Sequence, residues 1–114
     1  MRRGDLYRVP RPSAKDPKRF RLFVVVSRQT LIDSRYSSVV CAAVYSNRAG
    51  LVTEIPIGID EGLKHDSCIR CDELVNLRKN ELTHYVGLLS RVKIGELNRA
   101  LLVALDIPNE YYQL

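Results

Sequence analysis

Short apolar runs rich in β-branched residues, separated by turn-forming residues, dominate the chain from residue 4 to about residue 89. This pattern is typical of strands, because a strand needs only a few apolar residues whereas a helix needs a sustained 3.6-residue period. The two longest runs, residues 22–26 and 39–44, are almost uninterrupted. Uninterrupted runs predict strands that are buried on both faces, so we expect these two at the centre of a sheet.

Turn residues and prolines divide this region into six predicted strands. Residues 9–18 hold three prolines among basic residues, which predicts a loop, because proline cannot donate to a strand ladder. Pro56 favours an edge position for the strand that contains it, for the same reason. The predicted strands cover residues 4–9, 20–27, 38–45, 51–57, 67–72 and 83–89.

A helical period occurs once, near the end of the chain. Apolar residues at helical spacing form one stripe, and Pro108 beyond them predicts a stop. Six strands followed by one helix in 114 residues predict a mainly β fold, a small, strongly bent sheet or barrel with the helix packed against it. We expect one domain over residues 1–114. The stripe consists of Ile94, Leu97, Leu101, Leu102 and Leu105.

Composition narrows the class of protein. With 46% hydrophobic and 27% charged residues, the chain has the apolar surface for a core and lacks the signature of disorder. The net charge of +5 permits an anionic partner. No apolar run approaches the roughly 20 residues that cross a bilayer, and no signal-peptide core follows the N-terminus. Three cysteines do not make a disulfide framework, so we expect a soluble, cytoplasmic protein.

Two of the cysteines form a C-x-x-C pattern, Cys68 and Cys71, with His65 and His84 as conceivable further metal ligands. If residues 67–72 form a strand, the two thiols point to opposite faces and cannot share one ion without a sharp bend. A second C-x-x-C is also missing. We therefore predict no metal site and interpret Cys71, like Cys41, as a small core residue.

The same alternation predicts that Arg70 and Asp72 project from one face of this strand. A carboxylate beside a guanidinium can serve as base and cation when a 2′-hydroxyl attacks an RNA phosphate. It can equally be an ordinary solvated ion pair, which contributes about 0 to 1 kcal/mol. Spacing alone leaves both interpretations open.

Several short blocks occur in a fixed order along most of the chain: RGDLY at residues 3–7, RLFVVVS at 21–27, SN at 46–47, GL at 62–63, DS at 66–67, RCD at 70–72 and Gly87 before the helix. In order and spacing these blocks resemble the MazF/PemK (Kid-like) toxins of bacterial type II toxin–antitoxin modules. The resemblance implies an SH3-like barrel of the CcdB/Kid type with a C-terminal helix. It also implies a homodimer.

The activity that the resemblance implies is endoribonuclease cleavage of single-stranded RNA, without a metal or other cofactor. The products are a 2′,3′-cyclic phosphate and a 5′-hydroxyl. The resemblance also implies a cognate antitoxin, whose flexible acidic segment covers the substrate groove.

Carried over onto this sequence, the resemblance places catalysis on Arg70, Asp72 and Arg21. Asp72 is the expected base for the 2′-hydroxyl. Arg70 is expected to stabilise charge, because a guanidinium with a pKa above about 12 gives up a proton poorly. Arg21 takes the place of the arginine in the family's Arg-Pro block, where Leu22 replaces the proline.

Further residues are expected to bind RNA. Tyr45 stands where the family has threonine and could stack on a base, as could Tyr7. Ser46 could bond a phosphate oxygen or be an ordinary turn residue, and His65 could assist proton transfer or be an exposed loop histidine. The expected RNA-binding set is Asp16, Lys18, Arg19, Tyr45, Ser46, Asn47 and His65.

Two other functions are compatible with the sequence. CcdB-like proteins resemble this architecture but bind DNA gyrase through a Trp-containing tail, whereas residues 108–114 here contain Tyr111 and Tyr112 and no tryptophan. Alternatively, the basic face binds an acidic partner and no catalysis occurs.

Overall fold

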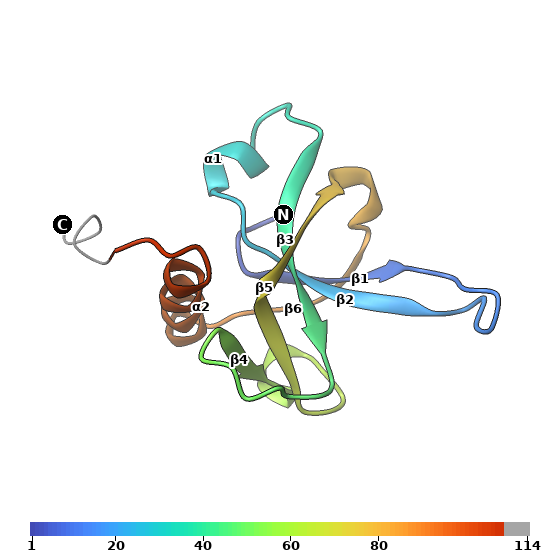
Figure 1. Cartoon of the computed structure of the whole chain (residues 1–114). Coiled ribbons are helices and arrows are strands. Elements are labelled where there is room, and N and C mark those ends of the chain that lie inside the picture. Colours follow the sequence, from blue (N-terminus) through green and yellow to red (C-terminus); the bar gives the residue numbers. More distant parts are fainter. Residues whose placement is uncertain (109–114) are drawn as a thin grey trace.

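A computed structural model describes residues 1–108, which form a strongly curled, six-stranded antiparallel sheet with a helix at one side (Figure 1). The strand order is β4-β5-β3-β2-β1-β6. The predicted mainly β fold with a C-terminal helix is confirmed. The strands are β1 (Asp5–Pro10), β2 (Phe20–Val25), β3 (Ser38–Tyr45), β4 (Glu54–Ile57), β5 (Ser67–Arg78) and β6 (His84–Leu88). The helices are α1 (Gln29–Ile32), α2 (Arg91–Ala104) and the 3-10 turns η1 (Ile59–Glu61) and η2 (Lys79–Glu81).

The two nearly continuous apolar strands, β2 and β3, lie at the centre of the sheet, as predicted. Their side chains alternate between two cores, because the curled sheet encloses apolar residues on both faces. Val24 and Ala42 belong to the core beneath α2, whereas Val25 and Cys41 belong to the core on the other face. Pro56 lies on the edge strand β4, also as predicted.

Strand β5 is longer than predicted and contains a bulge. Ala42 pairs with Leu74 but the next residue, Ala43, pairs with Arg70, so residues 71–73 have no counterpart on β3. Extra residues on one strand bend it and break the alternation of its side chains. The strand continues through polar residues to Arg78 because it keeps pairing with β3 down to Ser38.

Helix α2 begins after Ser90, whose hydroxyl accepts the Lys93 backbone N–H as an N-cap. Leu97 and Ala100 are buried against the sheet, where the helix contacts β4 and β5. The end of the stripe is less buried than predicted, because Leu105 lies beyond the last helical turn and is 55% exposed. No helix within residues 1–108 has the length and apolar character needed to span a membrane.

Two local predictions were wrong. Residues 51–53 precede β4 instead of belonging to it, because the Glu54 carboxylate binds the backbone N–H groups of residues 49–51 and folds this segment into a loop. The short helix α1 was missed, since four residues carry no helical period. Figure 1 shows the loop between β1 and β2 projecting away from the rest of the molecule.

Candidate active site

Two arginines, one from each of the strands that flank β3, contact the ring of Tyr45 at the end of β3. Leu22 of β2 pairs with Val44, so the preceding Arg21 lies beside Tyr45 on one side, and Arg70 of β5 approaches from the other. The guanidinium carbons lie 4.4 Å (Arg21) and 4.0 Å (Arg70) from the ring centre. Both cations are favourably placed against the π-electrons of this ring. The structure thus brings together three of the predicted site residues.

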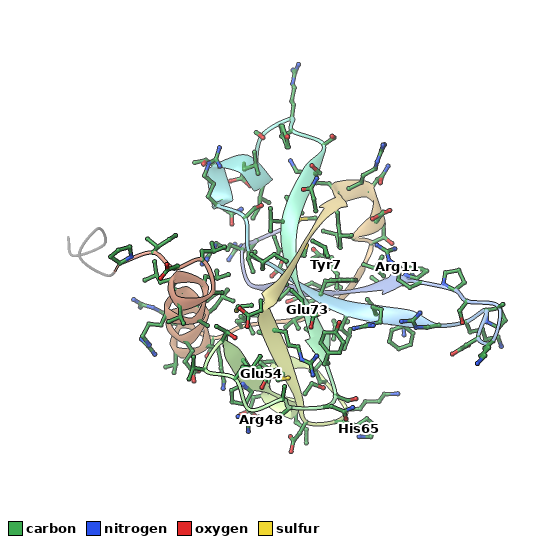
Figure 2. The ribbon with its side chains drawn as sticks, in the orientation of Figure 1. Tyr7, Arg11, Arg48, Glu54, His65 and Glu73 are labelled. Atoms are coloured by element: carbon green, nitrogen blue, oxygen red, sulfur yellow. The ribbon has the colours of Figure 1, made fainter. Side chains whose placement is uncertain are left out.

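Glu73 completes this group. The Tyr45 hydroxyl donates to its Oε1 at 2.6 Å, and its Oε2 lies 3.3 Å from Arg70 Nη1. The bond from Tyr45, with Arg70 and Arg21 nearby, lowers the pKa of the Glu73 carboxyl. In Figure 2 Glu73 lies near the middle of β5, whereas Glu54, which begins β4, lies beside the earlier part of β5. Glu73 therefore holds both the tyrosine and the arginine in place.

Glu54 anchors Arg70 from beneath. Its side chain is fully buried, yet its oxygens accept the backbone N–H groups of Ala49, Gly50 and Leu51 and the Nε–H of Arg70 at 3.2 Å. These bonds, with that of Ala49 the largest contribution, hold the pKa of Glu54 at about 2 despite burial. Glu54 thus fixes the Arg70 guanidinium and the loop after β3 at the same time.

The Asp72 carboxylate binds Thr53 and forms no ion pair with Arg70. The carboxylate is exposed, and its Oδ2 accepts the Thr53 hydroxyl at 2.5 Å. Because residues 71–73 form the bulge, the carboxylate of β5 that meets Arg70 is that of Glu73. Simple alternation along residues 67–72 predicted Arg70 and Asp72 side by side on one face, whereas the described structure contains no ion pair between them.

A groove of about 580 Å³ lies on the Arg21 side of Tyr45. Ser46, His65 and Arg19 line it together with Arg21 and Tyr45. Lys18 lines an adjoining hollow of about 390 Å³. Asp16 stays outside both and accepts the Lys18 backbone N–H within the β1–β2 loop. The backbone carbonyl of Asn47 accepts Arg70 Nη2 at 3.0 Å, so this residue contributes to the arginine's cage.

The remaining candidates, the cysteines and Tyr7, are packed inside the protein. Cys71 packs in the core beneath α2 while Cys68 faces Glu54, so the two thiols point to opposite sides. Burial raises the pKa of Cys71 to about 11 and that of Cys41 to about 12. Residues 1–108 contain no group of three or more His, Cys, Asp or Glu side chains placed to hold a metal ion. Tyr7 is 8% exposed and contacts Tyr85 edge-on, so its ring is not available to a base.

Sequence reasoning missed Glu54 and Glu73. Glu54 precedes the apolar Ile55 and alternates with it and Ile57, which is the pattern of an outward-facing residue, and nothing local marks a buried carboxylate there. The three N–H donors that satisfy Glu54 come from a loop whose shape depends on that carboxylate. Glu73 directly follows the RCD block, but only the bulge turns it towards Arg70.

Residues 2–105 match the family model described as "PemK-like, MazF-like toxin of type II toxin-antitoxin system". The chain belongs to this family. No curated protein sequence matches this MazF-like toxin.

Solved structures resemble its fold. The Mycobacterium tuberculosis toxin MazF-mt6 is 20% identical with a TM-score of 0.78, covering 91% of this chain and 98% of its own. A mycobacterial endoribonuclease in complex with its cognate antitoxin is 23% identical with a TM-score of 0.79, covering 95% and 97%. A MazE–MazF complex from Deinococcus radiodurans is 15% identical with a TM-score of 0.75, covering 95% and 97%. The curled sheet with its terminal helix is therefore the MazF-type fold.

Replacing Glu54 of this MazF-like toxin with glutamine tests the anchor. The folded pKa lies below the ordinary value of 4.5, so the charge stabilises the fold above that pH and the contribution is lost as the pH falls towards 2. We expect Glu54→Gln to lower Tm by about 5 °C or more near pH 7 and by much less near pH 2.5. Thermal melts across this range measure the difference. Glu96→Gln, on α2, controls for the loss of one carboxylate, and an equal Tm deficit at both pH values would contradict the assignment.

Proposed function

We propose that this protein is a sequence-selective endoribonuclease toxin that cleaves single-stranded RNA by attack of the 2′-hydroxyl. The observation that carries the proposal is the pair of guanidiniums on the Tyr45 ring beside a groove lined by cations. Membership of the MazF-like family and the endoribonuclease name of a structural neighbour support it. The cationic lining suits the phosphates of RNA.

In the proposed reaction the 2′-oxygen attacks the adjacent phosphorus as a base removes its proton. The bond to the 5′-oxygen then breaks, leaving a 2′,3′-cyclic phosphate and, after that oxygen gains a proton, a 5′-hydroxyl. The Arg70 and Arg21 guanidiniums stabilise the negative charge that builds on the phosphorane. Arg70 is well prepared for this because Glu54, Glu73 and the Asn47 carbonyl fix its orientation before substrate binds.

We assign the base to Asp72 rather than to Glu73. Asp72 is exposed and has one hydrogen-bond donor, the Thr53 hydroxyl, so its other oxygen can face a substrate. Both carboxylate oxygens of Glu73 are already engaged, one by the Tyr45 hydroxyl and the other by Arg70, so neither is free to take the proton of a 2′-hydroxyl. Asp72→Asn is therefore expected to reduce cleavage more than Glu73→Gln.

We also propose a cognate antitoxin and a homodimer. Structures of relatives contain a toxin with its cognate antitoxin and MazE with MazF. An acidic antitoxin segment lying in the groove would inhibit by occupying the phosphate positions. A groove shared across a two-fold axis would give RNA a longer track than one 13.0 kDa chain offers.

Cleavage of a long RNA by the purified protein in EDTA, with mapping of the cut sites and the new ends, tests the proposal. We expect cuts at a short motif with cyclic phosphate and 5′-hydroxyl ends. A single 2′-deoxy substitution at a mapped cut site should abolish cleavage there, since it removes the nucleophile. Cleavage of an all-DNA strand would refute this mechanism. Intact RNA with a gyrase-linked DNA-damage response on expression would favour the CcdB-like alternative. Its tail, residues 108–114, lies outside the described residues except for Pro108.

A further inference from the structure

We propose that Phe20 and Arg8 form a stacking subsite for an RNA base that flanks the cleaved bond. This inference rests on the proposed function, because it assigns part of the same substrate track. It concerns the outer end of the groove, where β1 and β2 lead into their connecting loop.

Phe20 is exposed although it begins a central strand. It is 47% exposed and belongs to neither apolar core. Its partner in the β1–β2 ladder is Pro10, and the Arg8 guanidinium carbon lies 4.8 Å from its ring centre. An aromatic ring and a guanidinium plane are the two kinds of protein surface on which unstacked RNA bases stack.

Phe20 stands where two hollows meet. The 580 Å³ groove beside Tyr45 and the adjoining 390 Å³ hollow share Arg8, Arg19 and Phe20 in their linings. A strand of RNA that follows the groove outward from Arg21 therefore passes over the Phe20 ring.

The lining of this track suits a polyanion. It includes no Asp or Glu, whereas the 510 Å³ hollow between η1 and α2 has three carboxylates in its lining, Asp60, Glu61 and Asp66, beside the cations Arg48 and Lys93. The track's cationic side chains can contact phosphates on either side of a stacked base. They are Arg8, Lys18, Arg19, Arg21 and Lys64.

Phe20 suits this role better than Tyr45. The Tyr45 ring already contacts two guanidiniums and donates its hydroxyl to Glu73, so a base could stack there only by displacing an arginine that the reaction needs. Phe20 has no such commitment beyond Arg8. Stacking accepts any base, so the subsite contributes affinity and position at a flanking nucleotide rather than base identity.

Equilibrium binding of a single-stranded RNA oligonucleotide, with 2′-deoxyribose at the mapped cut site to prevent cleavage, tests the subsite. If no cut site is found, a single-stranded RNA oligonucleotide without the 2′-deoxyribose is used. We expect Phe20→Leu to weaken binding by about tenfold or more and Phe20→Tyr to restore it. Tyr36→Leu, at an exposed aromatic beyond the opposite end of β3, is expected to bind as the parent does. Melting curves verify that each variant is folded.

Oligonucleotides with one abasic position identify the stacked base. At one position beside the cut site, removal of the base should weaken binding to the parent protein as much as Phe20→Leu weakens binding of the intact oligonucleotide. Phe20→Leu should lose no further affinity when that base is removed. Binding of Phe20→Leu equal to the parent overturns the subsite. The subsite is also overturned if Phe20→Leu weakens binding of every abasic oligonucleotide equally and weakens binding of polyglutamate by the same factor. That result would favour an acidic peptide as the occupant. Because binding needs no turnover, absent cleavage with Phe20-dependent binding would defeat the proposed function alone.

Discussion

Replacing Arg70 with alanine is expected to lower the rate of RNA cleavage by at least about 100-fold. A cation fixed beside the phosphorane acts in full only if it is already oriented when charge develops there. Arg70 meets this condition, because Glu54, Glu73, the Asn47 carbonyl and the Tyr45 ring hold its guanidinium, and its side chain is only 23% exposed. Single-turnover cleavage of a short RNA that contains one mapped site measures the effect.

Arg70→Lys separates charge from geometry at this position. Lysine keeps the charge, but it cannot place separate donors towards Glu54, Glu73 and the Asn47 carbonyl in one plane. We therefore expect lysine to recover little of the lost rate. Glu73→Gln is the comparison variant for Arg70→Ala, since it removes one of the arginine's carboxylate partners and leaves the cation. A cleavage rate for Arg70→Ala within about threefold of the parent would remove Arg70 from the proposed mechanism.

The strands were predictable where burial on both faces made the sequence continuously apolar. Residues 38–45 form β3 with the predicted bounds, because seven of those eight positions are apolar and Asn47 follows soon after. Residues 73–78 were not predicted as strand, since Glu73, Asn76 and Arg78 point outward from a half-exposed ladder. Their strand conformation comes from pairing with β3, which is a tertiary contact.

The arginines of the site were predictable from motif order, but their partners were not. Arg21 and Arg70 are the first residues of recognisable blocks, and the structure brings both to Tyr45. Because of the bulge, Glu73 rather than Asp72 lies beside Arg70. The bulge depends on the pairing of β5 with β3 on one side and with β4 on the other. A strand period of two residues holds only while each residue has one partner.

Gly87→Ala is expected to destabilise the fold by about 3 kcal/mol or more, the largest stability effect that we predict for a single methyl group. An added Cβ on β6 would overlap the Glu61 carbonyl oxygen and lie 2.8 Å from the Glu61 carbonyl carbon. These are backbone atoms of η1, so no side-chain rotation relieves the overlap. The turn that follows η1 is also tight, because a Cβ on Gly62 would lie 2.5 Å from the Val86 carbonyl oxygen.

Gly95→Ala is the matched control on α2, where a Cβ meets nothing closer than Arg99 Nη1 at 3.7 Å. It is expected to stabilise the helix by up to about 1 kcal/mol, so urea unfolding should move in opposite directions for the two variants. The contact at Gly87 also has a consequence for the groove, since Gly62, His65 and Val86 line it. Displacing η1 from β6 would widen the groove beside Arg21, so folded Gly87→Ala should bind RNA more weakly than Gly95→Ala. Equal stability of the two variants would show that η1 and β6 are not packed this closely.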